Sequence, residues 1–225
     1  MPSSTIENYL KHLLLLQQKQ DSLGEPAQVA TGKIASSLEV TPGTATVMVK
    51  SLAEAGLVDY ESRSGARLTH RGEKLALEVI RRHRIVELFL VKILGLDWSE
   101  VHEEAEVLEH AVSEKVLVRM DELLGHPAFD PHGDPIPDAM GKVRARKLSR
   151  LDECRPGQPL RVSQVENSDP AFLRFAESRG LTPGAALTIQ EADPMSDALM
   201  VQCDGGTPFV VGMSAARRVF VSPAR

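Results

Sequence analysis

Apolar residues near the start of the chain recur every three or four positions, which is the spacing of an amphipathic helix. The positions are Ile6, Leu10, Leu13, Leu14 and Leu16. Ser3, Ser4 or Thr5 can cap the N-terminus of this helix, and Gly24 with Pro26 marks its end. The pattern therefore predicts one helix between these two signals.

Two shorter helices are expected next. Thr31 is the expected cap of a helix over residues 32–38, and residues 39–40 form a tight connection. Thr41 then caps another helix, with Pro42 in its first position. The apolar positions of that helix are Val47, Val49, Leu52 and Ala53, and it ends at Gly56, a typical left-handed cap.

Two strands, residues 57–61 and 66–69, are predicted around the turn at 62–65. Two helices joined by a tight turn and followed by a hairpin form a winged helix-turn-helix, here in residues 1–75. In that fold the second helix enters the major groove of DNA and the wing touches phosphate. The candidate DNA contacts are Thr41, Gly43, Thr44, Thr46 and Lys50 on the helix, and Arg63 and Arg67 on the wing.

Two alternatives to DNA contact remain open for this part of the chain. The threonines also suit ordinary helix capping, and a winged domain can bind protein instead. Residues 1–75 contain eight basic and eight acidic residues, so their charge is no positive evidence for DNA.

Histidines and carboxylates follow at helical spacing. His83 and Glu87 are four residues apart, and His102, Glu106, Glu109 and His110 share one arc at about 100° per residue. Two antiparallel helices would present these groups to one another, and the carboxylates would repel unless they are protonated, splayed or bound to a cation. The pattern predicts a divalent metal site, with a solvated acidic helix face as the alternative.

The helix over residues 85–94 is apolar on nearly all sides and must be buried on more than one. The next helix carries an apolar stripe at Val112, Val116, Leu117, Met120, Leu123 and Leu124. We expect that stripe to meet a second subunit, because DNA half-sites related by a two-fold axis suit a homodimer. An intrachain core would explain the same stripe.

The last part of the chain changes character. Residues 140–150 are basic and polar, typical of a solvated linker that can add nonspecific DNA attraction. Short strands then alternate with glycine turns around one helix over residues 169–178, which predicts a small SH3-like barrel. The strands are expected at 160–165, 186–189, 198–203, 208–211 and 217–221. The barrel is expected to stabilise the dimer or to donate a metal ligand.

The predicted fold is therefore mainly α with β, in three domains and one linker. Residues 1–75 form the DNA-binding domain, 76–140 a helical metal-binding and dimerisation domain, 141–156 the linker, and 157–225 the SH3-like domain.

Composition narrows the function classes. A net charge of −5 argues against a broad polyanion-binding surface, and no long apolar run or signal sequence is present, so a cytoplasmic protein without a membrane partner is expected. Cys154 and Cys203 are far apart and are interpreted as packing residues.

The chain is not expected to be an enzyme. A di-iron oxidase needs Glu-x-x-His on facing helices, but position 107 before His110 is Val, and a zincin needs His where Glu106 stands. A metal-dependent hydrolase or oxidase is kept only as an alternative.

Several blocks in fixed order resemble the diphtheria toxin repressor and manganese transport regulator family of metal-dependent repressors, over nearly the whole chain. The blocks are residues 40–49 with 56–58, 68–72, 82–84 with Glu87, 101–106 with 109–110, and 132–137.

The resemblance implies specific metal ligands. The main site would use Asn8, His83, Glu106, Glu109 and His110, and ancillary ligands would come from Glu87, His102, Asp130, His132 and Asp169, with Glu166 as a substitute for Asp169. The chain departs from manganese members at Asn8, where they have an acid, and at Lys11, which cannot ligate while protonated. A second metal built as in those members is therefore not expected.

The same resemblance bears on the metal. The iron-responsive branch has cysteine where this chain has Glu106, and oxygen and imidazole ligands suit Mn²⁺ or Fe²⁺. We therefore expect a manganese-responsive repressor of metal-uptake genes that binds double-stranded operator DNA as a homodimer, with iron as the alternative metal. Zn²⁺, Co²⁺ or Cd²⁺ should also occupy the site in vitro.

Overall fold

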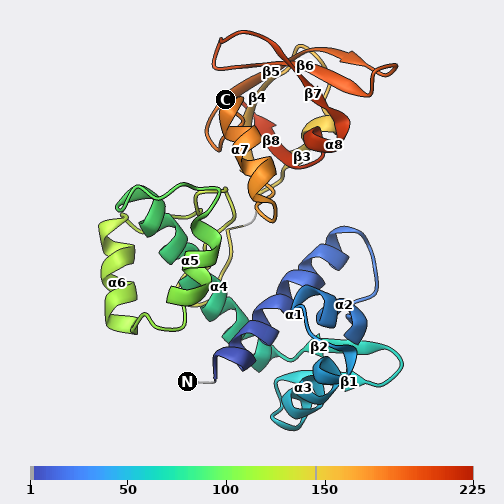
Figure 1. The fold of residues 1–225 in the computed structure, drawn as a ribbon, viewed down its shortest axis with the longest axis vertical. Coiled ribbons are helices and arrows are strands. Elements are labelled where there is room, and N and C mark those ends of the chain that lie inside the picture. The colour runs from blue at the N-terminus through green and yellow to red at the C-terminus, as the bar shows by residue number, and fades with distance from the viewer. Residues whose placement is uncertain (1–2, 145, 225) are drawn as a thin grey trace. The chain divides into compact units, whose positions relative to one another are not determined.

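The computed structural model describes residues 3–144 and 146–224, and Figure 1 shows their helices and strands. The chain divides into two compact units. One unit comprises Met1–Arg82 with Pro137–Lys142, and the other His83–Ile136 with Val143–Arg225. Helix α4 (His70–Lys92) contributes its first part to one unit and its second part to the other.

The first unit is a winged helix-turn-helix, as the pattern predicts. Its elements are α1 (Ser4–Ser22), α2 (Thr31–Ser37), α3 (Pro42–Glu54), β1 (Val58–Glu61), β2 (Gly65–Leu68) and the start of α4. The two strands pair antiparallel with Val58 opposite Leu68. Leu10, Leu13, Ile34, Val49 and Leu52 are almost fully buried in one core beneath them.

The helix ends of this unit follow local chemistry with one exception. The hydroxyl of Ser3 accepts the N–H of Ile6 at 3.4 Å, that of Thr41 accepts the N–H of Thr44 at 3.2 Å, and Gly56 has a φ of +68°. The predicted cap at Thr31 is wrong. Thr31 is the first residue inside α2, and the cap position is Ala30, whose side chain makes no capping bond.

The second unit contains the helical domain, built from the rest of α4 with α5 (Val101–Leu108) and α6 (Glu114–Leu123). Helix α4 is buried on two sides, as expected. Ile85 and Leu88 pack with Leu117 in one cluster, and Val86 and Leu90 pack in another. Helix α5 ends at Leu108, so Glu109 is its C-cap and His110 lies beyond it rather than on one continuous helical arc.

The apolar stripe around α6 divides between the interior and the surface. Leu117 is buried, and Val112, Met120 and Leu124 pack against the same intrachain cluster, so the core explanation holds for these four. Val116 and Leu123 are 46% and 69% exposed and remain available to a partner.

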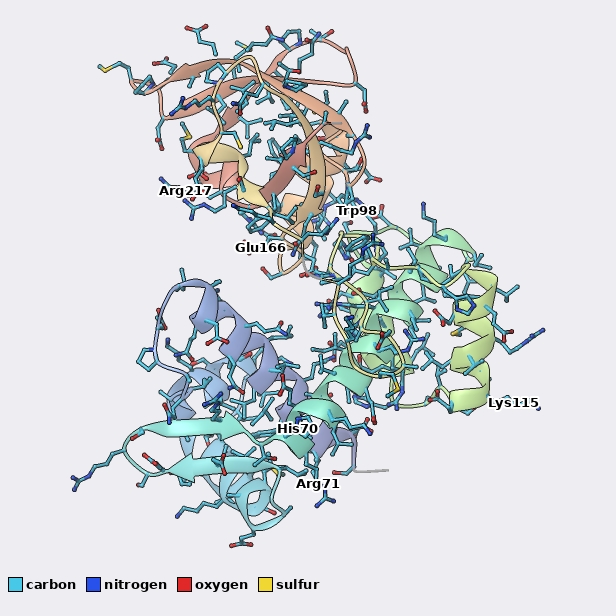
Figure 2. All side chains as sticks on the ribbon, turned by 180° about the vertical axis from the view of Figure 1, so that it is seen from behind. His70, Arg71, Trp98, Lys115, Glu166 and Arg217 are labelled. Carbon is cyan, nitrogen blue, oxygen red and sulfur yellow. The ribbon has the colours of Figure 1, made fainter. Side chains whose placement is uncertain are left out.

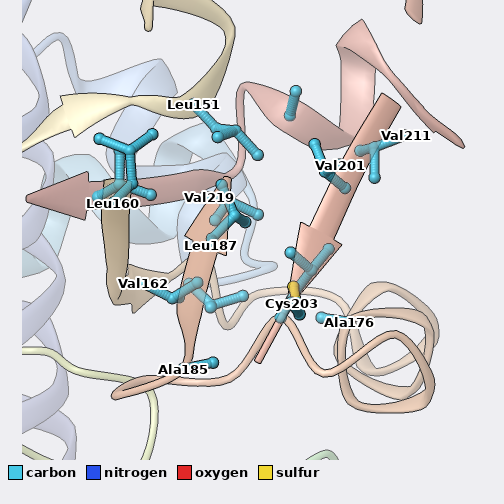
Figure 3. Close-up of a cluster of buried hydrophobic side chains, with 14 of the residues drawn as sticks. Leu151, Leu160, Val162, Ala176, Ala185, Leu187, Val201, Cys203, Val211 and Val219 are labelled. Atoms are coloured by element: carbon cyan, nitrogen blue, oxygen red, sulfur yellow. The ribbon is translucent and has the colours of Figure 1, made fainter. Parts of the chain in front are cut away.

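The barrel domain of the second unit is a six-stranded antiparallel sheet in the order β3-β8-β4-β5-β6-β7. Its helical elements are α7 (Pro170–Ser178) and the short α8 (Met213–Ala216). The strands are β3 (Ser149–Arg150), β4 (Pro159–Val165), β5 (Ala186–Asp193), β6 (Ala198–Cys203), β7 (Phe209–Gly212) and β8 (Val219–Pro223). Figure 3 shows Val162, Leu187, Val201 and Val219 among the side chains that fill its core.

The linker prediction needs two corrections. Residues 149–153 lie inside the barrel domain, because β3 pairs with β8 and the 3-10 turn Leu151–Glu153 places Leu151 in the core at 0% exposure. Arg146 is half-buried rather than freely solvated, and its guanidinium lies 3.7 Å from the ring centre of Phe129.

Both cysteines pack as expected, with free thiols against the barrel core. Burial, and then the neighbouring Asp204, raises the pKa of Cys203 to about 11. None of the helices in the described part of the chain combines the length and the apolar content that a membrane crossing needs.

Replacing Leu151 with Ala should destabilise the protein by about 2 to 5 kcal/mol, because it removes a fully buried side chain and leaves a cavity. Urea unfolding followed by circular dichroism measures this. Leu23→Ala, at a residue that is 64% exposed, is the control and should change little. A Leu151→Ala variant as stable as the wild type would show that residues 149–153 belong to the linker and not to the barrel core.

Candidate metal centre and DNA-reading helix

The start of α3 exposes the predicted DNA contacts. Thr41, Gly43, Thr44 and Lys50 are exposed, and Thr46 is half-buried. The hydroxyl of Thr46 donates to the carbonyl of Pro42 at 2.7 Å, and those of Thr41 and Thr44 lie 2.9 Å apart. The helix therefore uses much of its own hydroxyl chemistry for capping, which leaves methyl groups and Lys50 for a partner.

Val47, one of the apolar positions that define the predicted helix, does not belong to the buried face of α3. The buried residues Ala45, Val49 and Leu52 follow helical spacing, whereas Val47 falls off that stripe and is 71% exposed. That offset is visible in the sequence and could have marked Val47 as a surface residue.

The wing adds cations to this unit. Arg63 lies in the turn between β1 and β2, Arg67 lies on β2, and both are exposed. Arg71 is also exposed, and Figure 2 shows it with His70 at the start of α4. Arg71 lies outside the predicted contacts because it follows the hairpin.

The structure brings the four predicted main-site residues of the second unit, His83, Glu106, Glu109 and His110, together with His102, which was predicted as an ancillary ligand. We call these five residues the outer cluster. His83 Nδ1 lies 2.5 Å from Glu109 Oε2 and 3.8 Å from Glu106 Oε1. His102 Nε2 lies 3.4 Å from Glu106 Oε1, and His110 Nε2 lies 3.4 Å from Glu109 Oε1. The side chain of Glu109 is fully buried, while those of Glu106 and His102 are 28% and 50% exposed.

Three predicted ancillary residues form a separate inner cluster: Glu87, Asp130 and His132. All three are buried, and their ligand atoms lie within 4.8 Å of one another. Among the residues that the structure describes, Glu87 Oε2, Asp130 Oδ2 and His132 Nδ1 have no hydrogen-bond partner. Buried polar atoms without partners are unfavourable, and two carboxylate oxygens with one imidazole nitrogen form a suitable donor set for a divalent cation.

The ring of His132 is oriented by Trp98. His132 Nε2 lies 2.8 Å from the carbonyl oxygen of Trp98, so Nε2 carries the proton and donates it. The two rings also stack with centroids 5.3 Å apart. This arrangement leaves His132 Nδ1 with its lone pair free to bind a cation.

The charges of the inner cluster are unequal. Burial raises the pKa of Glu87, but the imidazoles of His83, His102 and His132 outweigh it, and the pKa lies well below its usual range. Burial, followed by the carboxylates of Asp134 and Glu87, raises the pKa of Asp130 well above its usual range.

A neighbouring cation, Arg84, was absent from the predicted site. Arg84 Nε lies 3.6 Å from Asp130 Oδ2, and the same guanidinium donates to the carbonyl of Pro135 at 2.6 Å. The place of Arg84 directly after His83 in the sequence indicates that it lies near the site. Its contact with Asp130, however, depends on a loop that is distant in sequence.

Two predicted ligands come from other parts of the chain. Asn8 is on α1 in the first unit, and its role remains a prediction. Asp169 caps α7 by accepting the N–H groups of Ala171 and Phe172, and it pairs with Arg218 at 3.0 Å, which lowers the pKa of its carboxyl. A cation would have to compete with Arg218 for Asp169. The substitute, Glu166, lies 3.6 Å from the same guanidinium.

A winged helix-turn-helix and two carboxylate–imidazole clusters in one chain define the class of metal-binding DNA-binding regulators. Known domains match in the same order along the chain. Residues 1–66 match the iron dependent repressor N-terminal DNA binding domain, and residues 69–138 its metal binding and dimerisation domain. Residues 149–223 match the FeoA domain.

Whole-chain relatives agree. The iron-dependent repressor IdeR of Mycobacterium tuberculosis is 30% identical over 199 residues, which cover 83% of this chain and 84% of that one. The diphtheria toxin repressor of Corynebacterium diphtheriae is 31% identical over 175 residues, 77% and 71% of the two chains. A solved manganese-dependent transcriptional repressor in complex with manganese has a TM-score of 0.87 at 37% identity, covering 97% of this chain and 99% of that chain.

The chain therefore belongs to the diphtheria toxin repressor family of iron- and manganese-dependent transcriptional repressors. The resemblance of the sequence blocks and the predicted architecture are confirmed.

Proposed function

We propose that this repressor responds to manganese and that its metal ligands are the outer and inner clusters. The observation that carries the proposal is the inner cluster, with three buried donor atoms left without hydrogen bonds among the described residues. Every donor in the two clusters is a carboxylate or an imidazole. Both cysteines pack against the barrel core instead. Such a donor set suits Mn²⁺ or Fe²⁺ rather than a soft metal.

Iron is the second candidate, because relatives such as IdeR are named as iron-dependent repressors. Glu106 favours manganese, since the iron-responsive branch that the sequence resembles has cysteine at that position. Zn²⁺, Co²⁺ or Cd²⁺ should bind in vitro, and solved structures of the related repressor ScaR contain Zn²⁺ and Cd²⁺. Asn8 is retained as a proposed additional ligand of the main site, and Asp169 as an ancillary one.

The proposed mechanism is linkage between metal and DNA. A metal that binds the DNA-competent state more tightly than other states raises operator affinity, and DNA must tighten metal binding by the same factor. A hundredfold response corresponds to about 2.7 kcal/mol of coupling. We propose a cytoplasmic homodimer that shuts off metal-uptake genes when metal is abundant, with Val116 and Leu123 as exposed apolar residues for the dimer contact.

The decisive experiment is an operator-binding titration with Mn²⁺, Fe²⁺ and Zn²⁺, each buffered at comparable free concentrations. Mn²⁺ should give the larger maximal increase in operator affinity, although Fe²⁺ and Zn²⁺ can occupy such a site at lower free concentrations. Operator binding that is unchanged after thorough chelation would reject metal control. A response to iron alone would support a metal-dependent regulator whose metal is iron rather than manganese.

The DNA surface proposed on α3 consists of the predicted threonines, Gly43 and Lys50, with Val47 added because an exposed aliphatic group can meet thymine methyls. Arg63 and Arg67 complete it on the wing. A lysine contact with phosphate carries no sequence information, so it should affect all DNA sequences alike.

Lys50→Ala should therefore weaken DNA binding with and without metal, and should reduce the slope of log affinity against log salt by about 1. Fluorescence anisotropy at several salt concentrations measures this. Lys19→Ala removes the same charge from an exposed position on α1 and is the control. A Lys50 variant that loses metal affinity but keeps its DNA affinity would contradict the assignment.

A further inference from the structure

The loop that carries two residues of the inner cluster is shaped by Asp130. Asp130 Oδ1 accepts the N–H groups of His132 and Asp134, each at 2.9 Å, and the backbone N–H of Asp130 donates to the carbonyl of Asp134 at 2.9 Å. These bonds use one oxygen of Asp130 and leave Oδ2 for the inner cluster. The loop therefore has a fixed local shape, but its position depends on what it packs against.

Strand β4 of the barrel is hydrogen-bonded to this loop. The N–H of Val165 donates to the carbonyl of His132 at 2.9 Å, and the side-chain amide of Gln164 donates to Asp134 Oδ1 at 2.9 Å. Val165 is fully buried, so its bond to the loop is shielded from water. The backbone of a proposed metal-binding residue is thus hydrogen-bonded directly to the barrel.

Gly133 marks how closely the two parts approach. Its φ is +89°, and a Cβ there would lie 2.1 Å from the carbonyl oxygen of Ser163 and 2.8 Å from the Cα of Gln164. Both are backbone atoms that cannot rotate away. Any side chain at position 133 must therefore push the loop and β4 apart.

Arg146 fastens the same loop from the segment that precedes β3. Its guanidinium donates to the carbonyl of Gly133 and stacks on the ring of Phe129 at 3.7 Å. Trp98, which orients His132, is also part of the barrel core cluster. The loop of the inner cluster is thus held by three residues of the barrel or its leading segment, Val165, Gln164 and Arg146, none of which supplies a ligand atom.

We propose that the barrel domain positions the inner cluster through the loop at residues 130–134, with Gly133 and Arg146 as positioning residues. A cation in the inner cluster and docking of the barrel on this loop then stabilise each other, because linkage between two events is reciprocal. The inference rests on the proposed function, since it takes the inner cluster as a divalent cation site.

The test uses Trp98, the only tryptophan in the chain. Because its ring stacks on His132, paramagnetic Mn²⁺ bound at the inner cluster should quench its fluorescence. Mn²⁺ alone is titrated into the full-length protein after removal of metal. Saturable quenching in the wild type that is lost in Asp130→Asn and retained in Glu109→Gln assigns the signal to the inner cluster.

Gly133→Ala should then shift the Mn²⁺ midpoint of Trp98 quenching upward by about tenfold or more, in the range seen when groups that orient metal ligands are lost. Gly157→Ala is the matched control, because Gly157 also has a positive φ of +80° but a Cβ there meets nothing within 4 Å. Arg146→Ala, a milder change, should shift the midpoint in the same direction, and Arg146→Lys should restore it only in part because it cannot stack a planar guanidinium on Phe129.

Hydrogen exchange supplies a second readout. Mn²⁺ should slow exchange of the Val165 amide in the wild type and should have no such effect in Asp130→Asn or Gly133→Ala. Because exchange is read at a single amide, a variant that unfolds globally is distinguished by uniform loss of protection.

Three results separate the possibilities. If Mn²⁺ does not quench Trp98 in the wild type, the inner cation site fails and this proposal fails with it, while operator titration still decides whether the protein is a metal-dependent repressor. If the wild type is quenched but Gly133→Ala has the midpoint of Gly157→Ala, the site stands and the positioning role is overturned. A selective shift in Gly133→Ala and Arg146→Ala supports the proposal.

Discussion

Glu109→Gln is expected to abolish the metal-stimulated part of operator binding and to weaken metal binding at the outer cluster by about 100-fold or more. The variant keeps the size of a fully buried side chain and its proximity to His83, so the fold should survive. It removes the negative charge that would hold the cation beside His83 and His110. Anisotropy with labelled operator across buffered Mn²⁺ concentrations measures the effect.

The matched control for that variant lies on α5, the helix that Glu109 caps. Glu103→Gln makes the same chemical change at an exposed residue of α5 and should leave the metal response intact. Equal metal stimulation in Glu109→Gln and in the wild type would exclude Glu109 as a ligand. Equal loss in both variants would point to net charge rather than to a specific site.

Asp130→Asn is expected to stabilise the metal-free protein and to remove the stabilisation that metal gives through the inner cluster. Because the pKa of Asp130 is raised in the folded state, folded protein binds a proton that the unfolded chain releases. Stability of the wild type is therefore lost as pH rises above the usual carboxyl range. Asparagine does not titrate, so its stability advantage over the wild type should grow as pH rises above the usual carboxyl range.

Thermal unfolding with and without Mn²⁺ checks this prediction. An ion at 100 times its Kd stabilises the wild type by about 2.7 kcal/mol per site, so the order of the two proteins should reverse when metal is added. Asp138→Asn is the control with the opposite sign. Hydrogen bonds from the backbone of Lys142 and Met140 lower the pKa of that carboxyl, so the wild type gains stability as Asp138 ionises and Asp138→Asn should become less stable relative to it as pH rises. A metal-free Asp130→Asn that becomes less stable than the wild type on raising the pH would contradict the charge assignment.

Local chemistry made the winged domain predictable. The cap at Thr41, the proline after it and the left-handed Gly56 are signals that lie within a few residues of the structure they specify. The hairpin is equally local, because β1 and β2 pair across a short turn. Thr31 was misassigned because a threonine at the start of a helix can equally occupy its first turn.

Contacts between distant segments were not predictable in the same way. Nothing in the spacing around Arg146 indicates that Phe129 will lie under its guanidinium, and polarity alone favoured a solvated linker. The same holds for Leu151. Its burial depends on β8, which pairs with β3 although it lies about 70 residues further along the chain. The barrel strands themselves were found, because apolar runs bounded by glycine turns are local.

The metal clusters were predictable only in part, because they combine local spacing with contacts between distant segments. Helical spacing placed His83 and Glu87 on one face, and the expected pairing of two helices brought Glu109 to His83. The division into two clusters could not be foreseen, because it depends on where the loop at 130–134 returns. The roles of Trp98 and Arg84 could not be predicted for the same reason, since Trp98 contacts His132 and Arg84 contacts Asp130 in that loop.

His83 contacts both groups of ligands through the two nitrogens of a single ring. Nδ1 faces Glu109, and Nε2 lies 3.0 Å from Glu87 Oε1, while the other oxygen of Glu87 faces His132 at 4.0 Å. Because one rigid ring makes both contacts, a substitution on either side changes how the ring is held on the other side. Paired substitutions at Glu87 and Glu109 should consequently be non-additive, and evolutionary drift at one of these positions will constrain what the other can become.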